Sequence, residues 1–334
     1  MIPANRPAAQ PVRWQQLWRE AVTDPHELLE QLGLSAHAAS LLPGADTGFA
    51  LRVPRGFVAR MRAGDPHDPL LLQVLPQAAE LGEVPGFGRD AVGDLASRAA
   101  HGVLHKYDGR ALLIATGSCA VHCRYCFRRH FPYAEETAAA NRWQLALEHL
   151  RADASIGEVI LSGGDPLSLS TPKLAELGDA LASIGHVRRL RIHTRLPVVL
   201  PERIDAEFAD WLGALPLQKV VVLHANHPNE IDAGVAAACL RLRHAGATVL
   251  NQAVLLRRVN DDAQALIGLS ERLFDAGVLP YYLHQLDRVA GAAHFEVDDG
   301  RAHALVEAMR VRLPGYLVPR LVREVAGAPF KLPQ

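Results

Sequence analysis

The sequence contains few cysteines, no long apolar run and no excess of either charge. Only four Cys occur in 334 residues, and three of them lie within eight residues, unlike the spread expected of a disulfide framework. No stretch of about 18 uninterrupted apolar residues is present, so we expect no membrane span. The 35 basic and 36 acidic side chains nearly cancel, which argues against a nucleic-acid or anionic-lipid partner.

The amino-terminal segment also lacks the features of a secretory signal. Residues 1–16 contain Pro and Arg but no apolar h-region. Together with the clustered Cys, this favours the reducing cytoplasm as the place where the protein works. The 49% hydrophobic composition supplies enough apolar side chains for a large core, either as two domains or as one α/β barrel.

From about residue 110 onward, short apolar runs alternate with helical patterns. The runs are expected to be strands, at 111–115, 159–161, 190–193, 219–223, 248–250 with 254–255, and 281–286. Helical spacing of apolar residues lies between them, at 143–150, 174–184, 235–242 and 266–273. This alternation predicts βαβ units with right-handed crossovers, and about six such units would curl into a full or partial barrel. Chemistry in such barrels lies at the carboxyl ends of the strands.

The first hundred residues are predicted to form a helical layer. Residues 14–34 have the apolar spacing of a helix, with Trp14 and Val22 on one face. Pro and Gly punctuate residues 63–87, so loops and short helices are expected there. The predicted regions are an N-terminal helical region (1–104), a barrel (105–315) and a carboxyl-terminal segment (316–334).

Three cysteines follow the first predicted barrel strand with the spacing C-x3-C-x2-C. They are Cys119, Cys123 and Cys126. Three thiolates on one loop can hold three irons of a cubane cluster and leave the fourth iron open. A structural zinc site with His122 or His130 as the fourth ligand is the alternative, but such sites usually combine two separated pairs of ligands.

This loop resembles that of the radical S-adenosylmethionine (SAM) superfamily, in which an aromatic residue such as Tyr125 typically precedes the last Cys. The resemblance implies a partial (β/α)6-type barrel and a [4Fe–4S] cluster whose open iron binds SAM. After the second predicted strand, Ser162, Gly163, Gly164 and Asp165 resemble the segment that meets the amino group of SAM. Glycine lets the backbone approach a ligand closely, which fits these four residues as cofactor contacts.

Longer strings resemble the lysine 2,3-aminomutase family from about residue 50 to the carboxyl terminus. They lie at 105–110, 162–167, 191–201, 224–230, 251–256, 280–287 and 294–295. The family moves the α-amino group of lysine to the β-carbon, whose C–H bond no side-chain base could break at neutral pH. The resemblance therefore implies a 5′-deoxyadenosyl radical made from SAM, and pyridoxal 5′-phosphate (PLP) to carry the migrating nitrogen.

The resemblance also implies residues that hold PLP. Lys331, in the turn-rich segment 327–333, matches the lysine that carries PLP as an imine. The phosphate of PLP needs cations and hydrogen-bond donors. By their positions in the family motifs, those candidates are Arg110, Arg195, Gln252, Tyr107 and Lys106.

The charged ends of lysine call for complementary side chains. The resemblance assigns Arg128 to the carboxylate, for which the guanidinium fork is suited. It assigns Asp287 and Glu324 to the distal ammonium, although the catabolic enzymes have Asp where Glu324 stands. His224, with Asn226 at the same strand end, is expected to contact SAM or the substrate.

Within the family, the compact chain ending at Gln334 looks most like the bacterial branch that makes (R)-β-lysine for elongation factor P. The predicted partners are L-lysine, an external one-electron reductant of the flavodoxin or ferredoxin type, and, functionally, elongation factor P and its ligase. Three alternatives stay open. They are a free-standing lysine or glutamate 2,3-aminomutase, a non-catalytic iron–sulfur protein, and an inactive enzyme that binds a partner.

Two observations weigh on these alternatives. A glutamate enzyme would need a cation where Asp287 and Glu324 stand. An electron carrier would bind all four irons with Cys, and only three clustered Cys are present.

Overall fold

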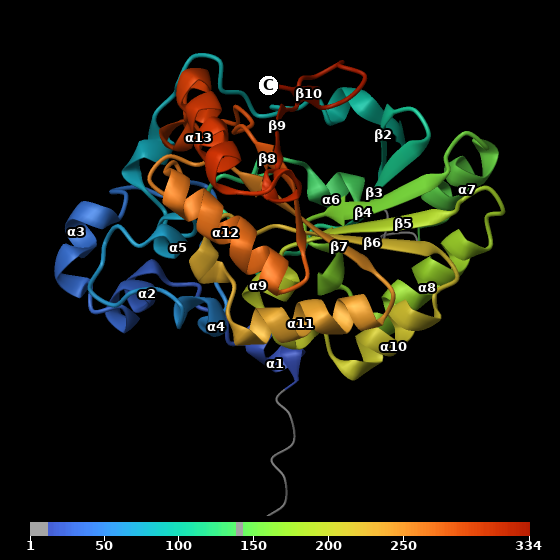
Figure 1. Ribbon diagram of the computed structural model, residues 1–334, viewed down its shortest axis with the longest axis horizontal. Coiled ribbons are helices and arrows are strands. Elements are labelled where there is room, and N and C mark those ends of the chain that lie inside the picture. The colour runs from blue at the N-terminus through green and yellow to red at the C-terminus, as the bar shows by residue number, and fades with distance from the viewer. Residues whose placement is uncertain (1–12, 138–142) are drawn as a thin grey trace, which may run out of the picture.

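A curved ten-stranded sheet forms the centre of the computed structural model, which describes residues 13–137 and 143–334 (Figure 1). Its strands are β1 (Arg98–Ala100), β2 (Val103–Tyr107), β3 (Arg110–Thr116), β4 (Glu158–Gly163), β5 (Arg189–Thr194), β6 (Gln218–Leu223), β7 (Thr248–Val254), β8 (Leu279–His284), β9 (Arg320–Arg323) and β10 (Leu332–Pro333). They lie side by side in chain order. Strands β3 to β9 pair in parallel, whereas β1–β2, β2–β3 and β9–β10 are antiparallel.

The sheet curls without closing. Among the described residues, the edge strands β1 and β10 do not pair with each other. The predicted α/β fold with a partial barrel is therefore confirmed, and the six expected strands correspond to β3–β8. Parallel strands need crossover connections, and helices supply them on the outer face of the sheet (Figure 1).

Thirteen α-helices and several short 3-10 turns are also present in the described chain, joined by loops. The longer helices are α7 (Gln144–Ala152), α8 (Thr171–Ala182), α10 (Ala206–Ala214), α11 (Ala233–His244), α12 (Ala263–Asp275) and α13 (Asp299–Arg312). The shorter ones are α1 (Trp14–Arg19), α2 (Pro25–Gln31), α3 (Ala38–Leu41), α4 (Arg55–Val58), α5 (Pro69–Leu72), α6 (Tyr133–Glu136) and α9 (Leu196–Val199). The 3-10 turns are η1 (Ser35–His37), η2 (Ala78–Leu81), η3 (Leu95–Ser97), η5 (Pro166–Ser168), η6 (Pro201–Arg203), η7 (Pro228–Glu230), η8 (Ala293–Phe295) and η9 (Gly315–Leu317).

Aspartates define where four of the long helices begin. The side chains of Asp205, Asp232, Asp262 and Asp298 accept hydrogen bonds from backbone N–H groups in the first turns of α10, α11, α12 and α13. Such caps satisfy donors that have no partner inside the helix.

The single helix predicted over residues 14–34 is wrong. It is divided into α1 and α2, and Val22 between them pairs with Val53 in an isolated antiparallel bridge. Pro25 explains the break, because proline lacks an N–H group and fits only the first turn of a helix, here capped by Asp24. The short helices expected within residues 63–87 are present as α5 and η2.

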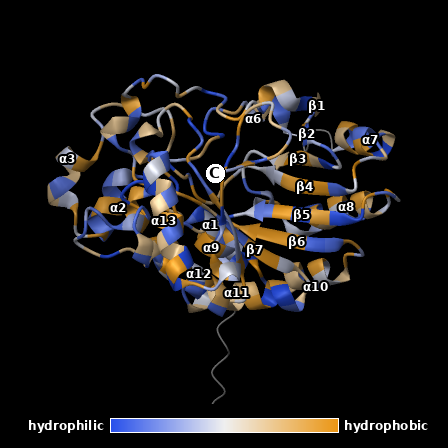
Figure 2. Ribbon diagram, turned by 45° about the horizontal axis from the view of Figure 1, so that its top comes forward, coloured by the Kyte–Doolittle hydropathy of each residue, from blue (hydrophilic) through white to orange (hydrophobic). Residues whose placement is uncertain are grey.

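One hydrophobic core joins the N-terminal helices to the barrel. Phe57 of α4 and Leu70 of α5 belong to the same cluster of buried side chains as Leu161 of β4 and Val221 of β6. Figure 2 shows hydrophobic residues on the central strands and on the flanking helices. The domain boundaries at 104 and 315 stay predictions.

Within residues 13–137 and 143–334, every helix is too short or too polar to cross a bilayer. Residues 1–12, for which the sequence predicts no secretory signal, lie outside the described residues.

Candidate active site

A cavity of about 630 Å³ lies at the centre of the curved sheet. Its walls come from residues of β2–β5 and β7–β9, the loop after β3, His224 after β6 and the carboxyl-terminal segment. Most of the predicted site residues line it: Cys119, Cys123, Cys126, Lys106, Tyr107, Arg110, Arg128, Ser162, Gly163, Gly164, Asp165, Arg195, His224, Gln252, Asp287, Glu324 and Lys331. Asn226 does not line the cavity, because its buried side chain donates to Gln73 Oε1 and Tyr125 Oη instead. Segments up to about two hundred residues apart in the chain thus meet at one site, as expected for strand ends of a parallel sheet.

The three clustered cysteines are free thiols on the loop that follows β3. Burial and the neighbouring Cys123 raise the pKa of Cys126 to about 11. Burial, followed by the other thiols, also raises the pKa of Cys119 well above its usual value. Three thiolates on this loop therefore need cationic partners, which the irons of a cluster would supply.

The structure gives no support to a zinc site at this loop. His122 Nδ1 lies 2.9 Å from the carbonyl oxygen of Ala50, and His130 Nε2 lies 3.1 Å from that of Ala290. In each ring one nitrogen is thus already engaged by a backbone carbonyl group. In the part of the chain that the structure describes, no three His, Cys, Asp or Glu side chains converge closely enough to hold a single metal ion.

The glycine pair at the end of β4 packs against the backbone of the cysteine loop. A Cβ added to Gly163, whose φ is +118°, would lie 2.5 Å from the carbonyl oxygen of Thr116. A Cβ added to Gly164 would lie 2.5 Å from the carbonyl oxygen of Ser118. The close approach that the sequence predicted is therefore made to the cysteine loop itself, and side chains at these positions would push the loop away.

Asp165 ties two strand ends together. Its Oδ1 accepts hydrogen bonds from Leu167 N and Thr194 Oγ1, and its Oδ2 accepts from the backbone N–H groups of Arg195 and Leu196. Burial nevertheless raises the pKa of this carboxyl. Both oxygens already have protein partners, so Asp165 fixes the loop around the site rather than offering a free acceptor.

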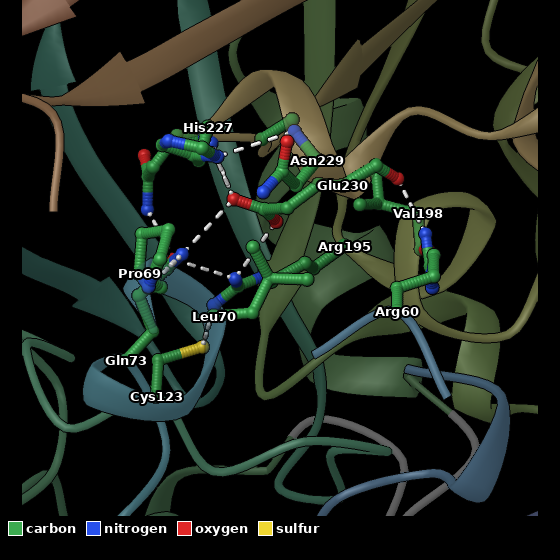
Figure 3. A network of polar contacts seen from close by, with 12 residues as sticks. Arg60, Pro69, Leu70, Gln73, Cys123, Arg195, Val198, His227, Asn229 and Glu230 are labelled. Carbon is green, nitrogen blue, oxygen red and sulfur yellow. Dashed lines mark hydrogen bonds and ion pairs between the residues drawn. The ribbon is translucent and has the colours of Figure 1, made fainter. Parts of the chain in front are cut away.

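The guanidinium of Arg195, like the carboxylate of Asp165, is fully engaged by other groups of the protein (Figure 3). Its Nη1 donates to Cys123 Sγ at 2.7 Å and to Tyr125 Oη at 2.6 Å. Its Nη2 donates to Gln73 Oε1 at 2.7 Å and to Glu230 Oε2 at 3.0 Å. These four bonds use the Nη hydrogens of Arg195 that a phosphate would need. The predicted contact between Arg195 and the phosphate of PLP therefore gains no support. Arg195 lies instead beside Cys123, a predicted cluster ligand.

Five charged side chains form an alternating chain across one wall of the cavity. Arg128 Nε lies 2.6 Å from Asp94 Oδ2, and Lys106 Nζ lies 2.6 Å from Asp94 Oδ1. The same Lys106 Nζ is 3.2 Å from Glu324 Oε1, and Lys331 Nζ pairs with Glu324 Oε2. The chain thus connects the predicted carboxylate-binding Arg128 to the predicted ammonium-binding Glu324 and PLP lysine.

This chain determines the charge of its members. Burial alone would lower the pKa of Arg128, but the Asp94 carboxylate raises that pKa above its usual value. Burial would raise the pKa of Glu324, but Lys331 and Lys106 together lower it to about 2. Glu324 is therefore an anion near neutral pH.

Asp287 is the least satisfied acid of the site. Burial, and next the carboxylate of Glu324, raise the pKa of Asp287 to about 7, against the opposing effect of Lys331 and Lys106. Its Oδ1 is buried and has no hydrogen-bond partner among the described residues. A cationic group entering the cavity would give this carboxyl a partner.

Neutral histidines line the cavity wall between the cysteines and Lys331. Burial lowers the pKa of His224 to about 3 and that of His193 and His284 well below the usual value. The His193 and His224 rings meet edge to face at 5.7 Å, and His224 Nε2 lies 3.0 Å from Gln252 Nε2. Sequence reasoning assigned no role to His193 or His284, although both lie in strings that carried the family resemblance.

A cationic end of the cavity lies at the start of the barrel strands. Arg110 stacks over the ring of Tyr107 at 4.7 Å. Arg191 of β5 and Arg320 of β9 line the same cavity, and neither was predicted as a site residue. Their position, on strands far apart in sequence, could not be read from local spacing.

Comparisons with known proteins agree with the family resemblance of the sequence. No protein-family model matches the chain. The L-lysine 2,3-aminomutase of Escherichia coli (strain K12) is 49% identical over 96% of this chain and 94% of that protein. The L-lysine 2,3-aminomutase of Clostridium subterminale is 32% identical over 96% of this chain and 77% of that protein.

The chain belongs to the lysine 2,3-aminomutase family. It is therefore an isomerase of the aminomutase type. Enzymes of this family use a [4Fe–4S] cluster, SAM and PLP. Among solved structures, a radical SAM methyltransferase from Sphaerobacter thermophilus is similar over 66% of this chain and 68% of that chain, with a TM-score of 0.49 and 16% identity.

Proposed function

We propose that this aminomutase converts L-α-lysine to (R)-β-lysine. The observation that carries the proposal is that one cavity is lined by the Arg128 guanidinium and, beside Lys331, by the carboxylate of Glu324 together with that of Asp287. An α-amino acid with a distal ammonium complements both ends.

Cys119, Cys123 and Cys126 would hold the [4Fe–4S] cluster. Three free thiols on one loop, with the pKa of Cys119 and Cys126 raised by burial, fit a site that gains positive charge from iron. Gly163, Gly164 and Asp165 would shape the SAM site beside that loop, since they are packed and bonded against it. Ser162 would add a hydroxyl, whose Oγ accepts from Arg128 Nη1 at 2.9 Å.

Lys331 would hold PLP through its side-chain amine. Arg110 and Tyr107 lie at the cationic end of the cavity and would bind the phosphate, while Gln252 and His224 would contact the rest of the bound cofactors. When bound, the three cofactors supply the radical hydrogen transfer and the amino-group migration. The protein side chains bind and orient, and the cavity excludes water.

Arg128 would bind the substrate carboxylate. Asp94 engages its Nε, which leaves the Nη edge facing Ser162 and the cavity. Asp287 and Glu324 would bind the distal ammonium. Glu324 Oε2, which pairs with Lys331 Nζ in the structure, would accept from the substrate ammonium when Lys331 holds PLP.

The test is an anaerobic assay of the reconstituted protein with SAM, PLP, dithionite and L-lysine, with β-lysine measured by mass spectrometry. We expect β-lysine only when all four additions are present. Formation of 5′-deoxyadenosine without β-lysine would refute lysine as the substrate and leave the radical chemistry intact. L-glutamate is the control substrate, and it should give no β-amino acid, because its side-chain carboxylate would meet Asp287 and Glu324.

We further propose that the product serves elongation factor P in the cytoplasm, where a flavodoxin- or ferredoxin-type protein would reduce the cluster. The similarity supports this branch, because the chain is 49% identical to the Escherichia coli relative but only 32% identical to the Clostridium one. The test couples the reaction to an elongation factor P ligase and follows the mass of elongation factor P. A factor that gains α-lysine and β-lysine at equal rates would contradict this role.

A further inference from the structure

Arg195 lies between a predicted cluster ligand and a buried carboxylate. The residue is 5% exposed, and its guanidinium makes the bonds to Cys123, Tyr125, Gln73 and Glu230 described above. The Arg195 guanidinium therefore contacts both the Cys123 thiol and the Glu230 carboxylate, unlike an arginine in an ordinary ion pair.

Glu230 keeps that cation in place. It is fully buried, and its Oε1 accepts from Gln73 Nε2 at 3.1 Å and from the backbone N–H groups of Asn226 and His227 at 2.8 and 3.0 Å (Figure 3). Its Oε2 faces Arg195. Because both carboxylate oxygens are fixed, the guanidinium is oriented with Nη1 toward Cys123.

We infer that the Arg195–Glu230 pair sets the reduction potential of the cluster. This rests on the proposed function, in which Cys123 is a cluster ligand. Reduction adds one electron from an external donor, so that [4Fe–4S]²⁺ becomes [4Fe–4S]⁺ and the ligated cluster gains one negative charge. A cationic N–H donor to a ligand sulfur stabilises the more negative state and so raises the potential.

The two members of the pair have opposite effects. Glu230→Gln removes a negative charge and keeps the donor, so the midpoint potential rises. Arg195→Gln combined with Glu230→Gln removes the donor without leaving a lone buried charge, so the midpoint falls below that of the unsubstituted protein. We expect at least a tenfold change in the ratio of oxidised to reduced cluster at fixed potential, which is about 59 mV for a one-electron couple.

The experiment is an anaerobic redox titration of each reconstituted variant with dithionite and mediators. The reduced cluster is measured by electron paramagnetic resonance without SAM, PLP or lysine, and iron and sulfide per chain are measured first. The control variant carries Arg55→Gln and Glu27→Gln, which change the same residue types in an exposed pair with N···O 2.6 Å. Its midpoint should equal that of the unsubstituted protein.

Opposite shifts in the two variants support the inference. Equal midpoints, or shifts in the same direction, at full iron content would overturn it. If the double variant binds no cluster, Glu230→Gln and Arg195→Lys carry the comparison, with the midpoint of Arg195→Lys expected below that of the unsubstituted protein because an ammonium cannot span the four acceptors. If the unsubstituted protein binds no cluster, the proposed function fails and this inference with it.

Discussion

At the scale of single residues, Asp287 links the site to pH. Its pKa of about 7 means that it is neutral in acid and ionised above neutrality. Only the ionised form pairs with the substrate ammonium, so the KM for lysine should fall as pH rises from about 6 to about 8. Asp287→Asn should abolish that dependence and lower kcat/KM by about 10- to 100-fold, the loss of one charged hydrogen bond. Initial rates of β-lysine formation across this range measure both.

The same residue affects stability with the opposite sign. Between the usual pKa of 3.8 and about 7, the folded protein binds more protons at Asp287 than the unfolded chain does. The contribution of this group to the free energy of unfolding therefore decreases as pH rises through that window. The stability of Asp287→Asn, measured by urea unfolding, should lack this decrease.

For the KM prediction, a KM of Asp287→Asn that still fell as pH rose would contradict the assignment of the pH dependence to the Asp287 carboxyl.

Lys331 is expected to be the attachment point of PLP. After borohydride reduction, the unsubstituted protein should retain PLP, whereas Lys331→Ala should not, because Lys106, the other amine that lines the cavity, is held by Asp94 and Glu324. Lys173 on α8 is exposed, and Lys173→Ala is the matched control that should retain PLP. Iron content should be unchanged in both variants. Equal retention of PLP by Lys331→Ala would refute the assignment.

At the scale of elements, the contact between β4 and the cysteine loop allows a sharp test. Gly164→Ala would bring a Cβ within 2.5 Å of the Ser118 carbonyl oxygen, and backbone atoms cannot easily move away. We expect the variant to lose iron and to be destabilised by about 1–3 kcal/mol, the usual effect of overpacking. Iron analysis and thermal unfolding measure both effects.

Gly185→Ala is the control for that prediction. A Cβ at Gly185 would meet no atom within 4 Å, and this glycine does not have a positive φ. It should therefore bind iron as the unsubstituted protein does. Full iron content and unchanged stability in Gly164→Ala would show that the loop tolerates the displacement.

Strands were easier to predict from the sequence than their edges were. Strands β3, β4 and β6 contain continuous apolar runs, as expected of a parallel sheet that is buried on both faces. Strand β5 alternates polar and apolar residues, because Arg191 and His193 face the cavity. Strand β9 was missed, since Arg320–Arg323 has only two apolar residues, which lie between two arginines. Helix α13 was also missed, although Ala302, Leu305 and Met309 on its buried side have helical spacing.

At the scale of the whole molecule, Arg60 joins the N-terminal helices to the barrel. It donates to the backbone carbonyl oxygens of Glu230 and, at 2.6 Å, of Val198 (Figure 3). Arg60→Ala should lower the free energy of unfolding by about 2–3 kcal/mol, since two charged hydrogen bonds are lost. Urea unfolding measures this, with the exposed Arg55→Ala as the control, which should change it by less than about 1 kcal/mol.

The site was predictable only in part. Its motif residues were found from the cysteine spacing and from the family resemblance, and they meet in one cavity. Asp94, Gln73 and Glu230 were not found, because their roles depend on contacts with residues more than thirty positions away. No local pattern marks a buried carboxylate that orients an arginine on another element.

The alternating chain from Arg128 to Lys331 has a consequence for selectivity. Within the protein, each of these charges already has an opposite partner. At these five charges a substrate therefore exchanges ion pairs, and it adds a new one only at Asp287. Its affinity should vary little with ionic strength, because the exchanged groups are shielded from bulk ions. A shorter diamino acid would break a protein ion pair at one end without replacing it. Because that loss is uncompensated, the cavity should select substrates by the distance between their charged ends.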